Sequence, residues 1–141
     1  MKLFPIILLL LSGCASPPPK GPLITRTFDK PYDAVWAAIV GEMTSRYPIR
    51  IIEKDSGVLE PEQMVLRNGG DYSQHPNIFL GAWGDTRVEI SVYAKPENGG
   101  TFVRIRTDFA RFEYSAFNNW FKCETTGRLE TEIMDGIAAR L

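Results

Sequence analysis

The chain has 141 residues, of which 44% are hydrophobic, and its formal net charge is −1. This length and composition suit a single globular domain with its own hydrophobic core. The nearly balanced charge, without a basic stripe, argues against a nucleic-acid-binding protein, and no acidic block indicates a solvating tail.

The N-terminal residues have the three parts of a secretory signal. Lys2 supplies the positive charge, residues 3–11 form an uncharged apolar run, and the small residues Ser12 and Gly13 precede Cys14. A helix of about nine residues covers only about half of a ~30 Å hydrocarbon core. We therefore expect residues 1–13 to be a cleaved leader and not a permanent membrane span.

The segment Leu11-Ser12-Gly13-Cys14 resembles the bacterial lipoprotein signal, in which an aliphatic residue and two small residues precede the modified cysteine. The resemblance implies cleavage after Gly13, a diacylglycerol thioether on Cys14 and a fatty acid on the new N-terminus. Two or three acyl chains together anchor a protein stably in a membrane. The alternatives are an ordinary signal whose cysteine forms a disulfide, and an N-terminal apolar strand.

The residue after the cysteine indicates which membrane holds the anchor. An acidic residue at that position is associated with retention in the inner membrane, whereas this chain has Ala15. We therefore expect the outer membrane, with the domain facing the periplasm, or the plasma membrane if the cell has a single membrane.

Cys14 and a proline-rich linker occupy residues 14–22. Three successive prolines favour an extended polyproline II chain of about 25 Å, which would keep the following domain, residues 23–141, close to the bilayer. If Cys14 carries lipid, Cys123 has no partner within the chain. We expect Cys123 to be a buried free thiol, and the alternative is a reactive or intermolecular thiol.

The domain begins with a short alternating strand at residues 23–29. Pro31 then fits the first turn of a helix over residues 32–46, with Asp29 or Lys30 as its cap. The apolar residues of this helix form one stripe, which consists of Val35, Trp36, Ile39, Val40 and Met43. We expect Trp36 in the core, and Asp33, Glu42 and Arg46 outside the stripe.

A hairpin of two strands, residues 47–55 and 58–66, follows the helix, with Pro61 marking an edge or a bulge. Residues 67–84 are expected to form a long loop. This loop contains four large apolar side chains, Ile78, Phe79, Leu80 and Trp83. They either fold back on the sheet as a plug or form an exposed contact patch for a partner.

Two further strands, residues 86–94 and 101–109, alternate between apolar and polar side chains around a turn at residues 96–100. Such a pair is typical of an antiparallel sheet that is covered on one side only. The polar side carries Arg87, Glu89, Arg104, Arg106 and Asp108. We interpret it as a solvated surface with cross-strand pairing, and a ligand-binding basic patch is the alternative.

The closing segment, residues 123–141, predicts an amphipathic helix of about four turns that starts at Thr125 or Thr126. Its apolar side consists of Leu129, Ile133, Met134, Ile137, Ala138 and Leu141. The order strand, helix, four strands, helix predicts an α+β fold. We expect an antiparallel sheet of about five strands with two helices on one face, in a helix-grip arrangement.

Residues 29–43 and 47–62, DKPYDAVWAAIVGEM and YPIRIIEKDSGVLEPE, resemble the helix and first hairpin of a known domain. It is the domain of accessory lipoprotein C of the outer-membrane β-barrel assembly machinery and of small envelope lipoproteins that share the pattern. Residues 123–130 also match a Cys, Thr, Gly and Leu-Glu pattern in the tail of those proteins. The resemblance implies the fold and the envelope location. That assembly lipoprotein has two such domains and a long extended segment that contacts its partner, so no partner-contact residue is transferred.

We expect no catalysis, cofactor or metal. The chain has one histidine, His75, and two cysteines, which cannot supply a structural zinc site. Neither a G-x-S-x-G nor a G-x-G-x-x-G motif occurs. The neighbouring acids Glu60 and Glu62, and the pair Asp71 and His75, are more typical of solvated loops than of acid/base sites.

Two hypotheses for function follow. The first is a non-catalytic interaction or assembly module of the envelope, held by its lipid anchor and docking envelope proteins through residues 67–84 or a sheet edge. The second is a carrier of a lipid or another small apolar ligand beneath the C-terminal helix. A filled core favours the module, and an apolar pocket of roughly several hundred Å³ favours the carrier.

Overall fold

The computed structural model describes residues 23–67, 72–74, 83–114 and 118–141. The first half of the domain contains β1 (Ile24–Phe28), α1 (Tyr32–Arg46), β2 (Ile49–Glu53), β3 (Val58–Pro61) and β4 (Met64–Leu66). The second half contains β5 (Ser73–Gln74), β6 (Trp83–Glu97), β7 (Gly100–Glu113), β8 (Asn119–Thr125) and α2 (Arg128–Ala138).

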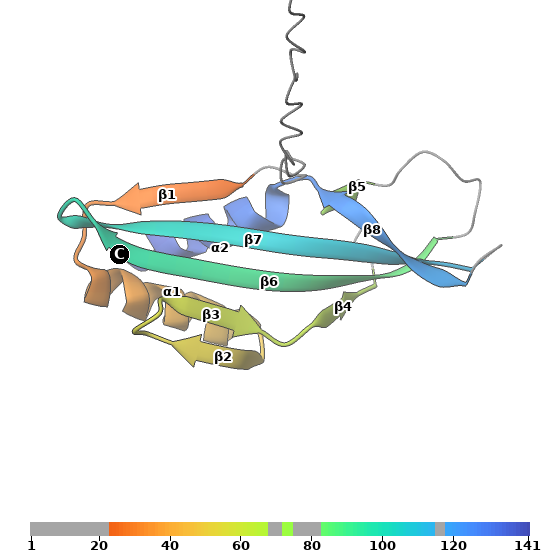
Figure 1. Ribbon diagram of the computed structural model, residues 1–141, viewed down its shortest axis with the longest axis horizontal. Helices are drawn as coiled ribbons and strands as arrows, with labels where there is room; N and C mark the ends of the chain where they lie inside the picture. Colours follow the sequence, from red (N-terminus) through yellow and green to blue (C-terminus); the bar gives the residue numbers. More distant parts are fainter. Residues whose placement is uncertain (1–22, 68–71, 75–82, 115–117) are drawn as a thin grey trace, which may run out of the picture.

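A long hairpin of β6 and β7 organises the sheet (Figure 1). Its pairing runs from Glu97 opposite Gly100 at the turn to Trp83 opposite Glu113 at the far end. Asn98 and Gly99 form the turn, with φ angles of 49° and 80°. Positive φ at both central residues is the signature of a type I′ turn, whose twist matches that of the paired strands. The Asn-Gly pair therefore sets the register of the hairpin.

The two ends of this hairpin have different neighbours. On the β7 side, β1 pairs with residues 101–105 near the turn and β8 pairs with residues 109–113. On the β6 side, β3 pairs with residues 92–93 and β4 with residues 86–88. The sheet has the order β2-β3-β6-β7-β8-β5 and is antiparallel throughout. In the middle of the hairpin, residues 89–91 of β6 and 106–108 of β7 pair with each other but with no further described strand on their outer sides.

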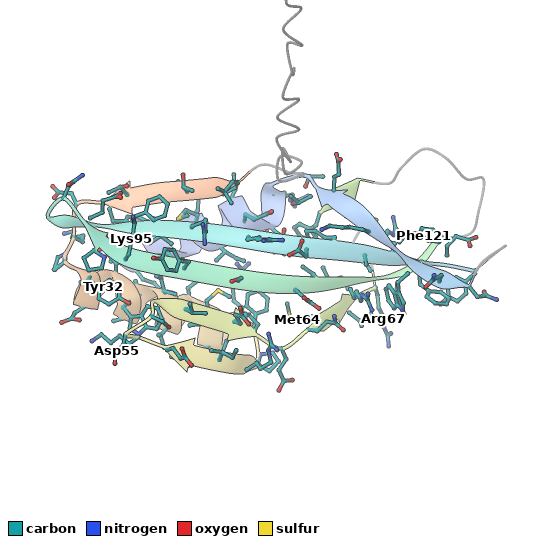
Figure 2. The ribbon with its side chains drawn as sticks, in the orientation of Figure 1. Tyr32, Asp55, Met64, Arg67, Lys95 and Phe121 are labelled. Atoms are coloured by element: carbon teal, nitrogen blue, oxygen red, sulfur yellow. The ribbon has the colours of Figure 1, made fainter. Side chains whose placement is uncertain are left out.

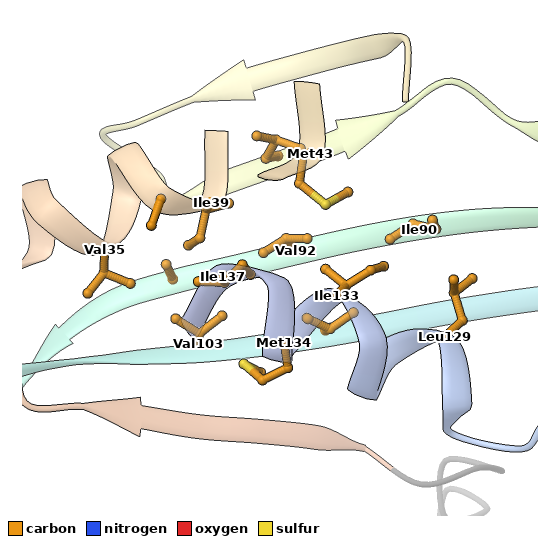
Figure 3. Close-up of a cluster of buried hydrophobic side chains, with 14 of the residues drawn as sticks. Val35, Ile39, Met43, Ile90, Val92, Val103, Leu129, Ile133, Met134 and Ile137 are labelled. Atoms are coloured by element: carbon orange, nitrogen blue, oxygen red, sulfur yellow. The ribbon is translucent and has the colours of Figure 1, made fainter. Parts of the chain in front are cut away.

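The core lies between the sheet and the two helices, which pack on the same face (Figure 3). Alternate residues of the hairpin, including Val88, Val92, Val103 and Ile105, point to this side and have no exposed surface. Opposite them lie buried helix residues, which include Val35, Ile39, Met43, Ile133 and Ile137. The predicted α+β fold, with two helices on one face of an antiparallel sheet, is confirmed.

The strands differ from the prediction in length and number. The expected strand over residues 58–66 is divided into β3 and β4, because the chain leaves the sheet at Glu62, whose N–H donates to Pro48 O at 2.9 Å. The hairpin strands are longer than predicted on both sides. Neither β5, which has only 2 residues, nor β8, which has 7, was predicted, and residues 123–125 of the expected closing helical segment belong to β8.

Helix α1 buries Trp36, as predicted, but it also buries Glu42, which we expected outside the apolar stripe. The carboxylate of Glu42 forms ion pairs with Arg46 at 3.3 Å and with Arg140 at 2.9 Å. The partner that makes this burial possible comes from the other end of the chain. The predicted caps, Asp29 and Lys30, are wrong, because the helix starts after Pro31 without a side-chain cap.

Helix α2 starts after Gly127, whose φ is 80°, and is shorter than predicted. Thr125 and Thr126 are not the N-cap residue, but their hydroxyls accept hydrogen bonds from the N–H groups of Gly127 and Arg128 at 2.9 and 3.4 Å. Leu141 lies beyond the helix and is 37% exposed, so its predicted place on the apolar side is wrong. Among the described residues, no helix is long and apolar enough to cross a membrane.

Candidate functional site

The predicted lipidation and cleavage positions, Cys14 and Gly13, lie outside the described residues and stay predictions. Cys123 is free and 5% exposed, as predicted. Burial raises the pKa of its thiol, and the Sγ atom lies 3.6 Å from the carbonyl oxygen of Phe121. A thiol in this state is protonated near neutral pH and is a poor nucleophile.

The structure describes only part of the segment that carries the predicted contact patch. Ile78, Phe79 and Leu80 lie outside the described residues. Trp83, which we expect in the loop, is instead the first residue of β6, opposite Glu113. Its side chain is not described, so the patch stays a prediction.

The described residues point to a different surface, the face of the sheet opposite the helices. We call it the open face, and it consists of Arg50, Glu60, Gln63, Val65, Arg87, Glu89, Ser91, Tyr93, Lys95, Phe102, Arg104, Arg106, Asp108, Ala110, Phe112, Trp120 and Lys122. The predicted separation of apolar and polar sides in residues 86–94 and 101–109 is confirmed, since the apolar residues between these positions are buried, among them Val88, Val92, Val103 and Ile105.

The middle of the open face contains paired charges. Glu89 and Asp108 lie directly opposite each other on β6 and β7. Two like charges at such positions repel each other, but each has its own partner. Gln63 Nε2 donates to Glu89 at 2.6 Å, and Asp108 binds Arg106 at 3.1 Å and Lys122 of β8 at 3.3 Å. The predicted cross-strand pairing is therefore present in this region.

Two neighbouring hollows lie over these charges. One of about 420 Å³ is lined by residues that include Arg50, Glu60 and Ser91, and one of about 390 Å³ by residues that include Arg87, Ala110, Trp120 and Lys122. Both share Gln63, Glu89, Arg106 and Asp108 as lining. The first hollow lies where β3 and β4 separate and leave part of β6 without a neighbour. The second lies over Ala110, which has the smallest side chain among the open-face residues of β7.

A third hollow, of about 430 Å³, lies at the turn end of the hairpin and is lined by residues that include Tyr32 and Lys95, both labelled in Figure 2. Burial raises the pKa of Tyr32, and the hydrogen bond to Asp33 raises the pKa of Lys54, which also lines this hollow. Both groups therefore keep their protons near neutral pH. No residue of α2 lines any of the three hollows, whereas Ile133 and Ile137 of α2 are fully buried against the sheet.

Cations of the open face lie over aromatic rings. Arg104 stands 5.0 Å from the ring centre of Tyr93, its direct neighbour across the hairpin. Lys95 stands 5.5 Å from the ring of Phe102 in the same way. Arg87 crosses over Ala110 to reach Trp120 of β8, at 4.7 Å. These contacts hold the long cationic side chains against the sheet.

The far end of the open face is aromatic. Phe112 contacts Trp120 edge-to-face, with ring centres 5.4 Å apart, and Tyr114 likewise at 4.9 Å. The ring of Tyr114, 55% exposed, covers Gly84, where a Cβ atom would lie 2.0 Å from the ring. Sequence reasoning missed this cluster because β8, which supplies Trp120, was not predicted. The alternation in residues 109–114 was the available signal.

The arrangement suits binding by charge and aromatic contact. Within the described ranges, no group of three or more His, Cys, Asp or Glu residues is placed to hold a metal ion. No protein-family model and no curated protein matches this chain.

Proposed function

We propose that this protein is a lipid-anchored, non-catalytic interaction module of the bacterial envelope, which docks another envelope protein on its open face. The observation that supports this proposal is the open face itself, where aromatic rings and cations surround two joined hollows. Tyr, Trp and Arg are the residues that most often dominate the free energy of protein–protein binding.

The dimensions of the open face suit a protein partner. Strand β7 has 14 residues, which corresponds to a length of about 45 Å. Interfaces of standard size bury about 800 Å² on each partner, and a sheet face of this length with several strands supplies such an area. Exposed apolar groups, such as Val65 at 58% and Tyr114 at 55%, gain from being covered.

The anchor and the open face are compatible. The described chain enters through β1, which lies at the edge of the sheet beside β7 (Figure 1). The open face is therefore not occupied by the entering strand. Residues 14–22, if extended, would keep the domain within about 25 Å of the lipid on Cys14, where partners in the same membrane are available.

The packing of the domain does not favour a carrier. A carrier needs an apolar pocket between the helices and the sheet. In that space Ile105, Ile133 and Ile137 have no exposed surface, and the two joined hollows lie on the other side of the sheet, with charged and polar groups in their lining.

Photo-crosslinking in intact cells tests the docking. A photoreactive amino acid at Gln63, which lines both joined hollows, should give a reproducible adduct with one envelope protein. The same amino acid at Ala37, exposed on α1 behind the sheet, is the matched control and should not give this adduct. Equal adducts from both positions, or none from Gln63, would contradict the proposal.

Palmitate labelling tests the anchor separately. The intact chain should incorporate labelled palmitate and fractionate with membranes, and the Cys14→Ser variant should lose both the label and the membrane association. Label retained in Cys14→Ser would show that the anchor is elsewhere.

A further inference from the structure

We infer that the partner binds through an extended acidic segment whose carboxylates occupy two sites on the open face, one at Arg87 and one at Arg104. This inference rests on the proposed function and specifies the chemistry of the docked protein. Arg87 and Arg104 are the two arginines that lie closest to aromatic rings in the described part of the chain.

Each of these guanidinium groups lies against an aromatic ring, and no described carboxylate binds it. Arg87 lies 4.7 Å from the ring centre of Trp120, and Arg104 lies 5.0 Å from that of Tyr93. Neither forms an ion pair with any carboxylate among the residues that the structure describes. Contact with a ring uses the flat side of a guanidinium, while its N–H donors lie in the plane and remain available for a carboxylate. The ring thus holds each arginine ready for a bidentate contact.

Other arginines of this protein contact an aromatic ring and a carboxylate at the same time. Arg26 lies over Phe28 and binds Asp135 at 3.1 Å. Arg46 lies over Tyr47 and binds Glu42 at 3.3 Å. Arg128 lies over Tyr72 and binds Glu132 at 2.9 Å. In each case the chain itself supplies the carboxylate. Arg87 and Arg104 have no such carboxylate among the described residues, and we assign this role to the docked segment.

The spacing of the two sites defines the segment. Arg104 lies opposite Tyr93, which is six residues from Arg87 along β6 and on the same face. Six residues of an extended strand span about 20 Å. A partner segment that lies along the hairpin in extended form would therefore place carboxylates at both arginines if they are about six residues apart. The joined hollows lie between the two sites and receive the side chains in the middle of the segment.

The charges between the sites favour a protein segment over an anionic membrane surface. Glu89 and Asp108 lie on the open face between Arg87 and Arg104. Together with Glu60, they line the hollow of about 420 Å³. A uniformly anionic bilayer would press headgroups against these carboxylates, and like charges at short distance are costly. A polypeptide can place acidic side chains at the two arginines and neutral or basic ones between them.

The first experiment uses the full chain in cells, with the photoreactive group at Gln63. The crosslinked partner peptide is sequenced by mass spectrometry, and it should contain two Asp or Glu residues about six positions apart. Arg87→Gln and Arg104→Gln should each lower the adduct yield by about five-fold or more, and the double variant further. Arg26→Gln is the control, because this arginine also lies over a ring but already has Asp135 as its carboxylate, and its yield should not change.

The second experiment uses purified full-length protein in neutral detergent. A synthetic Ser/Thr/Gly peptide with two Asp residues six positions apart is compared with one in which they are two positions apart. The wider spacing should bind about five-fold or more tightly, and the advantage should vanish in Arg87→Gln and in Arg104→Gln, each first shown to retain its melting temperature. Arg104→Lys, which keeps the charge but loses the planar donors, should bind with intermediate affinity.

The outcomes separate this inference from the proposed function. If Gln63 crosslinks one protein and the two arginine variants do not reduce the yield, the function stands and the inference is wrong. If Gln63 gives a lipid adduct in place of a protein adduct, both are wrong. If no adduct forms, the proposed function fails, and equal binding of the two peptides would overturn the inference as well.

Discussion

Glu42 of α1 and Arg140, which follows α2, form an ion pair of 2.9 Å between residues 98 positions apart in the chain. Arg140 also donates to Ser45 Oγ at 3.0 Å. Gly136 of α2 lies directly against the Glu42 carboxylate, because a Cβ atom at that position would be 2.2 Å from Oε1. These contacts fix the two helices against each other and complete the layer that covers the core.

Gly136→Ala should therefore destabilise the domain. Alanine is the better helix former by about 1 kcal/mol, but its methyl group would displace the Glu42 carboxylate from its two arginines. We expect a net loss of about 1–3 kcal/mol in the free energy of unfolding, measured by urea denaturation. Gly41→Ala is the control, since its Cβ would meet only the flexible Arg140 side chain at 3.3 Å, and it should be neutral or stabilising. Equal effects of the two substitutions would contradict this account of the helix contact.

Features that depend on near neighbours in the chain are predictable from the sequence, and features that depend on distant residues are not. The alternation in β6 and β7 and the apolar stripe of α1 depend on near neighbours in the chain, and both are confirmed. The burial of Glu42 depends on Arg140, so no pattern within residues 32–46 indicates it. The same holds for β8, whose short segment becomes a strand by pairing with residues 109–113.

The candidate site was predicted only in part for the same reason. The charges of the open face were identified from alternation, and the pairing of Asp108 with Lys122 agrees with the expected cross-strand contacts. The contact between Arg87 and Trp120 crosses β7 and joins residues of two strands that are not neighbours in sequence. Such a pair is visible only once the register of all three strands is known.

The buried carboxylate of Glu130 gives a second prediction. Glu130 is 1% exposed and accepts hydrogen bonds from Thr107 Oγ1 at 2.6 Å and Thr125 Oγ1 at 3.0 Å, which tie α2 to β7 and β8. Thr107→Val removes one donor without changing the shape of the side chain, and should lower the free energy of unfolding by about 1–3 kcal/mol. Thr25→Val, on the exposed side of β1, should change it by less than about 0.5 kcal/mol in the same urea titration. A Thr107→Val protein as stable as Thr25→Val would show that Glu130 does not need this hydroxyl.

The thiol of Cys123 gives a prediction for reactivity and for pH. In the Cys14→Ser variant, where Cys123 is the sole thiol, iodoacetamide at pH 8 should react at least about ten-fold more slowly with the native protein than with the protein in urea. Burial raises the pKa of the native thiol above its ordinary value of 9.0, so the unfolded chain loses its proton at the lower pH. The contribution of Cys123 to stability is therefore intact below about pH 9 and falls as the pH rises toward the native pKa.

The free energy of unfolding at alkaline pH and the rate of alkylation test this account of Cys123. The free energy of unfolding should decline as the pH rises above about 9, and the decline should be smaller in a variant that also carries Cys123→Ser. Burial raises the pKa of Tyr47 as well, so some alkaline loss should remain in that variant. Rapid alkylation of the native protein would show that Cys123 is accessible and would overturn the assignment of an inert core thiol.

The last prediction concerns Ala110, which lies on the open face of β7 between Arg87 and Lys122. Its small side chain leaves the hollow of about 390 Å³ and lets Arg87 reach the ring of Trp120. Ala110→Leu should fill part of this hollow and displace the guanidinium, while the exposed sheet face tolerates the larger side chain within about 1 kcal/mol of stability. The crosslink from Gln63 should then decrease by about ten-fold, although no charge has been removed.

Ala37→Leu adds the same atoms to the exposed side of α1 and should leave the crosslink unchanged. Because Ala110→Leu alters shape and the arginine variants alter charge, the two sets separate the contributions of the hollow and of the cations to docking. An undiminished crosslink in Ala110→Leu, with the arginine variants still reducing it, would mean that the partner rests on the cations at the rim and does not enter the hollow. An undiminished crosslink in both sets would place docking away from this part of the open face, because neither its shape nor its charge would then affect binding.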